Sequence, residues 1–83
     1  MRIPLDKKSD VPLYYQIESY LRQGILSGSL PPDMRLPACR QLAKDLGVNR
    51  TTVENAYAKL EADGLVFSRM GSGTYILPVN PIP

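Results

Sequence analysis

The spacing of apolar residues along the chain predicts three helices, because each set repeats with the period of one helix face. The first set recurs at every fourth position and consists of Leu13, Ile17, Leu21 and Ile25. The second set is shorter and consists of Leu42, Ala43 and Leu46. The third set follows the i, i+3, i+4, i+7 spacing and consists of Val53, Ala56, Tyr57 and Leu60. We therefore expect helices that begin near Pro12, Ala38 and Arg50.

Glycine, proline and asparagine mark the ends of these helices. Gly28 is predicted to stop the first helix, and Pro37 suits the start of the second because its fixed φ is already helical. Gly47 should end the second helix with a positive φ, and Gly64 should end the third. Asn49 is expected to cap the third helix, its side chain accepting a backbone N–H of the first turn.

The region after Gly64 alternates between apolar and turn-forming residues. Residues 65–67 and 74–77 are apolar or β-prone and flank a turn that contains Gly71 and Gly73, which predicts a β-hairpin. Residues 34–36, between prolines, suit a very short strand.

Three segments follow from these boundaries. Residues 1–11 are polar and aperiodic and are interpreted as an N-terminal arm. Residues 12–77 form the predicted domain. Residues 78–83 contain three prolines and are interpreted as the start of a linker or a tail.

The element order predicts a winged helix-turn-helix, a mainly α fold of three helices plus a two-stranded wing. Only residues 47–49 separate the second and third helices, and a glycine-containing turn of this length is typical of the helix-turn-helix. In that motif one helix braces against DNA while the next presents its N-terminal residues to the major groove. We expect a recognition helix at about residues 50–63 in the major groove and a wing at residues 65–77 on the adjacent groove.

Composition removes several functional classes. The chain has no histidine and one cysteine, Cys39, so it offers no catalytic triad and no thiolate or imidazole metal site. We therefore expect no enzyme, no catalytic residue and no metal. The single cysteine cannot form an internal disulfide, and no signal peptide or transmembrane segment is visible, which together favour a cytoplasmic location.

Charge directs attention to the centre of the chain. The net charge is only +2, but residues 35–50 hold four cations and one anion. Such a basic segment is typical of nucleic-acid binding, although a solvated helix face would give the same count. A winged helix used as a protein–protein interaction module is the alternative function, since the fold alone does not decide between them.

Seven residues are predicted to contact DNA. On the third helix Arg50 can fork onto guanine, and Thr51 and Thr52 can bind phosphate or a thymine methyl. On the second helix Arg40 is in reach of a phosphate or base, and Lys44, one turn later, of the backbone. At the wing, the other two residues are Arg69 and Gly71. Glu54, one turn past Arg50, would repel phosphate unless it is paired, or could accept from a cytosine amino group.

Several strings resemble the winged-helix domain of GntR-family bacterial regulators, and the Ala-Tyr pair and the wing are most similar to the MocR subfamily. These strings are Pro12-Leu13-Tyr14-Tyr15-Gln16-Ile17, Arg35-Leu36-Pro37, Arg40-Gln41-Leu42-Ala43, Leu46-Gly47-Val48-Asn49-Arg50-Thr51-Thr52-Val53, Ala56-Tyr57 and Arg69-Met70-Gly71-Ser72-Gly73-Thr74-Tyr75.

The resemblance implies that this domain binds a double-stranded DNA operator, through residues that match Arg40, Arg50, Thr51, Thr52 and Gly71. It implies no cofactor in this chain. Pyridoxal phosphate is implied only for a C-terminal domain that MocR-like proteins carry after a linker. We expect a monomer for the isolated domain and a homodimer for a full-length regulator. Asp33, Ala38-Cys39, Asn49 and Glu54 depart from the residues usual in the family.

Overall fold

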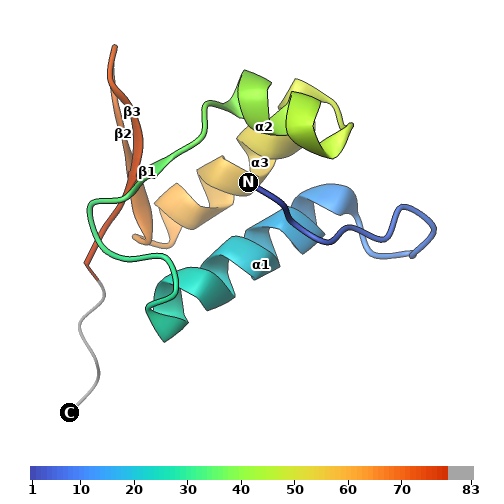
Figure 1. The fold of residues 1–83 in the computed structure, drawn as a ribbon, viewed down its shortest axis with the longest axis horizontal. Coiled ribbons are helices and arrows are strands. Elements are labelled where there is room, and N and C mark those ends of the chain that lie inside the picture. The colour runs from blue at the N-terminus through green and yellow to red at the C-terminus, as the bar shows by residue number, and fades with distance from the viewer. Residues whose placement is uncertain (79–83) are drawn as a thin grey trace.

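A computed structural model describes residues 1–78 and places three helices beside one antiparallel sheet (Figure 1). In chain order the elements are α1 (Leu13–Ser27), β1 (Arg35–Leu36), α2 (Cys39–Leu46), α3 (Arg50–Ala62), β2 (Val66–Arg69) and β3 (Gly73–Ile76). The winged-helix prediction is confirmed. Within residues 1–78, none of the helices has the length and apolar character needed to cross a membrane.

The sheet has one more strand than the predicted two-stranded wing. The strand order is β1-β3-β2, so β3 lies in the middle and pairs with both neighbours. In the register, Arg35 of β1 and Phe67 of β2 both lie opposite Tyr75 of β3. The short strand predicted at residues 34–36 therefore forms and joins the hairpin to the segment that leads into α2.

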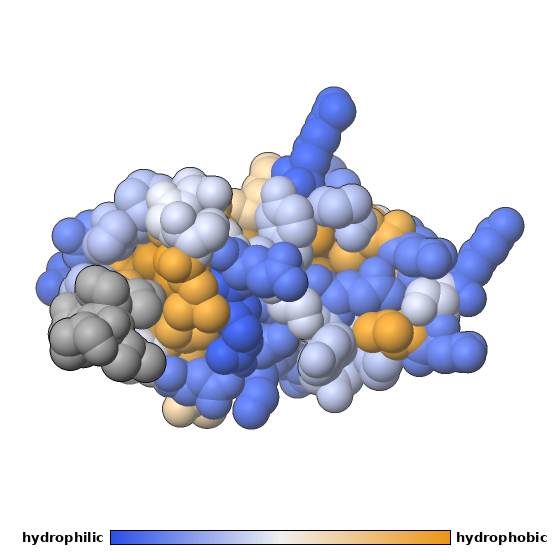
Figure 2. All heavy atoms as spheres, turned by 90° about the horizontal axis from the view of Figure 1, so that it is seen from below, coloured by the Kyte–Doolittle hydropathy of each residue, from blue (hydrophilic) through white to orange (hydrophobic). Residues whose placement is uncertain are grey.

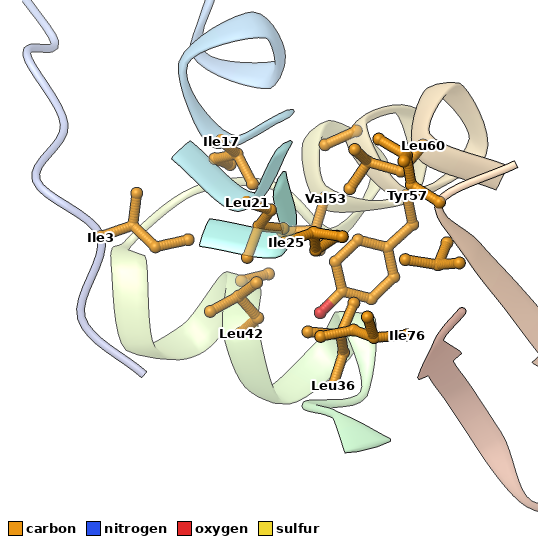
Figure 3. Packing of buried hydrophobic residues seen from close by; sticks show 14 residues of the cluster. Ile3, Ile17, Leu21, Ile25, Leu36, Leu42, Val53, Tyr57, Leu60 and Ile76 are labelled. Carbon is orange, nitrogen blue, oxygen red and sulfur yellow. The ribbon is translucent and has the colours of Figure 1, made fainter. Parts of the chain in front are cut away.

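The predicted apolar stripes form one core, except that Leu13 lies outside it and Leu46 is only partly buried. α3 packs against both α1 and α2, and the sheet closes the end of the core (Figures 1 and 3). The side chains of Ile17, Leu21, Leu42, Val53 and Leu60 have no exposed surface. Removing such side chains from water supplies most of the stabilisation of a domain this small.

The helix ends differ from the prediction in detail. α2 begins at Cys39 rather than Ala38, because Ala38 is the extended N-cap residue. Gly47 ends α2 in the left-handed conformation, as predicted. Asn49 is the N-cap of α3, but the predicted side-chain bond is absent. The backbone carbonyl of Asn49 instead accepts the N–H of Thr52 at 3.0 Å, so the first turn is bonded without the side chain.

Residues 1–11 contain no helix or strand, but they are fixed against the domain. Ile3 is 5% exposed and joins the core, which its aperiodic surroundings did not predict. The Gln16 side chain binds the backbone of Asp6 at both its N–H and its carbonyl. Lys7 Nζ donates to the carbonyl of Gly47 at 3.0 Å. The arm therefore crosses from the start of α1 to the end of α2.

A charged cluster joins α1 to the end of α3. Among residues 1–78, Glu18 is the buried charged side chain, 4% exposed. The Arg22 guanidinium donates to the carboxylates of Glu18 and Asp63. The hydrogen bond from Arg22, together with the positive charge of Lys59, holds the pKa of the Asp63 carboxyl below its usual value. Lys59 lies 3.6 Å from the other Asp63 oxygen and is largely exposed.

Arg22→Ala should lower the free energy of unfolding by about 2 kcal/mol or more, because it leaves the buried Glu18 carboxylate without its counterion. Lys59→Ala, which removes an exposed partner of the same cluster, should change it by about 0.5 kcal/mol or less. Urea unfolding of the two variants and the parent chain measures both effects. Equal effects of the two substitutions would contradict the assigned role of Arg22.

Candidate nucleic-acid interface

The first turn of α3 faces solvent at the residues predicted to contact DNA. Val53 and Ala56 of α3 are fully buried, whereas Arg50 and Thr51 are exposed. Thr52 is half-buried at the edge of the helix. The N-terminus of α3 thus presents a guanidinium, a hydroxyl and the positive end of the helix dipole together.

α2 carries the second group of predicted residues. Leu42 and Ala43 are buried against α3, so Arg40 and Lys44, four residues apart, share the exposed side. The N-cap residue Ala38 makes no side-chain bond to the first turn. An anion that approached Arg40 would therefore meet backbone N–H groups that no side chain caps.

Tyr57 fixes the start of α2 against α3. Its ring lies in the core near Leu36 and Ile76 (Figure 3), and its hydroxyl donates to the carbonyl of Pro37 at 2.7 Å. Burial raises the pKa of Tyr57, which keeps the phenol protonated as a donor. The bond positions residues 38–40 beside the face of α3 that carries Arg50.

The charges around Cys39 also show that the start of α2 lies close to α3. Burial raises the pKa of the Cys39 thiol, the nearby Glu54 carboxylate raises it further, and the Arg50 guanidinium lowers it. The first residue of α2 therefore lies within electrostatic reach of both charged groups on α3. Arg40, the next residue along α2, is exposed.

Arg50 is paired with Glu54. Arg50 Nε lies 3.2 Å from Glu54 Oε2, and the two side chains are 64% and 47% exposed. The carboxylate that was expected to repel phosphate unless paired is thus paired with the guanidinium predicted to read a base. An exposed pair of this spacing is weak, about 0.3–0.5 kcal/mol, so Arg50 can leave it for a stronger acceptor.

The hairpin holds the remaining predicted residues, Arg69 and Gly71. Its turn points to the same side of the molecule as α2 (Figure 1). Arg69 lies over the Phe67 ring, 5.7 Å from its centroid, and is exposed. Gly71 has a φ of 77°, and no atom lies within 4 Å of where its Cβ would be. Glu61 of α3 accepts the N–H of Ser68 at 2.8 Å and so fixes the hairpin relative to α3.

The outer face of the sheet also carries Arg35, a residue for which the sequence predicted no DNA contact. A Cβ on Gly73 would lie 2.8 Å from Arg35 Nε, so the glycine lets this side chain cross the middle strand. Arg35 and Arg69 thereby share a face with the stacked rings of Phe67 and Tyr75, whose centroids are 5.7 Å apart. The sequence feature that could have identified Arg35 as a candidate is its place in the basic segment 35–50.

The side of the molecule away from α2 and the hairpin turn has a different character. Figure 2, which views the molecule from this side, shows an apolar patch there. A hollow lies at the end of α1 and is lined by Ile25, Leu26, Leu30 and Leu77, among others. None of the seven predicted contact residues belongs to this lining.

The charge environment of Cys39 gives a test of the geometry that needs no ligand. The thiolate is the reactive form, so a lower thiol pKa gives faster alkylation near neutral pH. Glu54→Gln should speed the reaction of Cys39 with iodoacetamide, and Arg50→Gln should slow it. Lys59→Gln, on the side of α3 that faces α1, should leave the rate unchanged. Unaltered rates in both Glu54 and Arg50 variants would show that α2 and α3 do not meet as described.

The chain resembles known regulators over most of its length. It is 47% identical over 77 residues to a "probable rhizopine catabolism regulatory protein MocR" from Rhizobium meliloti, with 93% of this chain and 16% of that protein covered. It is 40% identical over 72 residues to the "HTH-type transcriptional repressor NagR" from Bacillus subtilis, with 87% and 30% covered. The chain thus spans less than a third of either relative.

Solved structures share the fold. YtrA from Sulfolobus acidocaldarius, described as a GntR-family transcription factor, superposes with a TM-score of 0.82 at 34% identity, over 95% of this chain and 82% of the other. The AraR DNA-binding domain in complex with operator ORE1 gives 0.74 at 30% identity, over 92% and 90%. The family described as "Bacterial regulatory proteins, gntR family" matches residues 13–76. This chain belongs to the GntR family.

Proposed function

We propose that this chain binds double-stranded DNA sequence-specifically, as the DNA-reading domain of a transcription regulator. The observation that carries the proposal is the exposed basic face where the N-terminal turns of α2 and α3 meet. Arg40 in the first turn of α2, Lys44 in its last turn and Arg50 in the first turn of α3 are all exposed. The superposition with AraR in complex with its operator supports the same partner for this fold.

Each element has a distinct role in this proposal. The first turn of α3 enters the major groove, where Arg50 forks onto a guanine and Thr51 and Thr52 contact the adjoining backbone or a thymine methyl. Arg40 and Lys44 bind phosphates and fix the register of the domain on the duplex. The hairpin follows the adjacent groove, with Arg69 and the open backbone at Gly71 near the sugar-phosphate chain.

Concentrated cations favour DNA over a protein partner. The core of a protein interface is depleted of charged residues, whereas phosphate binding requires them. We place no cofactor on these residues. We propose that the domain works in the cytoplasm, where the bacterial chromosome lies, and that a regulator carrying it binds paired half-sites as a homodimer. A single domain then contacts one half-site.

Binding to a random-sequence duplex tests the proposal directly. Fluorescence anisotropy at 50 to 200 mM salt should show an affinity that falls steeply with salt, towards a Kd of about 10⁻⁴–10⁻⁶ M at physiological salt. Lys44→Ala should flatten the plot of log K against log salt by about one unit, because one phosphate contact is lost. No binding by the parent chain at 50 mM salt would contradict the proposed function.

Lys59→Ala is the matched control, since it removes the same charge from the side of α3 that faces α1. It should leave the salt slope close to that of the parent chain. If Lys44→Ala and Lys59→Ala change the slope equally, Lys44 contacts no phosphate and only the net charge matters.

A further inference from the structure

We propose that Glu54 is a specificity-determining residue, which weakens phosphate binding at the α3 face and accepts a hydrogen bond from the amino group of a cytosine. The inference rests on the proposed function, because it concerns the DNA that the domain selects. It assigns a role to the acidic side chain on a face otherwise composed of cations and hydroxyls.

The position of Glu54 is the first support. It lies one turn beyond Arg50 on the same side of α3, with its carboxylate 3.2 Å from the guanidinium and 47% of the side chain exposed. Its charge also reaches Cys39 at the start of α2. The carboxylate therefore lies between the two helix ends that form the proposed interface, and not on a remote surface.

The Arg50–Glu54 pair gives the carboxylate an effect on DNA that does not depend on sequence. In the free domain the guanidinium has a local acceptor, so a phosphate must compete with Glu54 for it. The carboxylate also repels any phosphate that approaches the first turn of α3. Both effects weaken binding to arbitrary DNA, where phosphate contacts supply nearly all of the affinity.

A matching base reverses this disadvantage. Arginine binds the O6 and N7 acceptors of guanine, and a carboxylate accepts from the N4 amino group of cytosine. At a site that offers both, Arg50 leaves the pair for guanine and Glu54 receives a new donor in its place. Each charged group is then hydrogen-bonded, whereas a guanine or thymine at the cytosine position turns acceptors towards the carboxylate. The Arg50–Glu54 pair thus increases the difference in affinity between a matching site and other DNA.

Selection from a randomised duplex pool tests the role of Glu54. The parent chain should enrich sites with a cytosine at one position of the half-site. Glu54→Gln should shift that position to adenine, since glutamine pairs with the N6 and N7 of adenine, and Glu54→Ala should lose the preference there alone. The enrichment should change by about tenfold or more at that position. Identical selected sites for all three proteins would overturn the proposal.

The affinity for a random-sequence duplex tests whether Glu54 weakens phosphate binding. At 50 mM salt Glu54→Gln should bind about three- to tenfold more tightly than the parent chain. Asp10→Asn is the charge-matched control, because Asp10 is an exposed carboxylate in the segment before α1. A gain for Asp10→Asn equal to that for Glu54→Gln would overturn the local role of Glu54.

The two proposals fail in different ways. A parent chain that binds no random duplex and enriches no sequence contradicts the proposed function itself. A parent chain that enriches an operator, while Glu54→Gln enriches the same operator, contradicts only the role of Glu54. Since Glu54 is exposed and glutamine has nearly the same shape, loss of folding does not account for either result.

Discussion

The fold depends on the burial of one side of α3, which is shared by every other part of the core. α3 packs against both α1 and α2, and through Tyr57 it binds the carbonyl of Pro37 in the segment that enters α2. Because this side faces inward, Val53 of the first turn is buried, while Arg50 and Thr51 of the same turn face solvent. The same packing that stabilises the domain therefore exposes Arg50 and brings the start of α2 next to it.

The wing depends on the same helix. Glu61 of α3 accepts the backbone N–H of Ser68, and β1 continues directly into the turn before α2. The sheet thus has two connections to the helices, one at each outer strand. A shift of α3 would move the hairpin as well, so the two groups of proposed DNA contacts depend on the position of one helix.

Much of the fold could be predicted from the sequence, because helix periods and turn residues act locally. The left-handed conformation at Gly47 follows from the absence of a Cβ. Asp33 adopts a similar conformation, with a φ of 67°, which is tolerated for aspartate but is not evident from the pattern. The burial of Ile3 and the bond between Arg22 and Asp63 arise from tertiary contacts between distant residues, which no local spacing indicates. For the candidate site, residue type identified the cations and threonines. That Cys39 lies close to Arg50 and Glu54 could not be predicted from the sequence and is known only from the structure.

The central claim is that DNA binds to one face of the domain. This face is formed by the N-terminal turns of α2 and α3 and by the hairpin turn. Amide chemical shifts of the labelled chain, followed by NMR during titration with a short duplex, test it most directly. The account predicts that the shifted amides cluster at residues 39–44, 50–55 and 69–73. Clustering on the outer side of α1, or around the apolar hollow at Leu26 and Leu77, would contradict it.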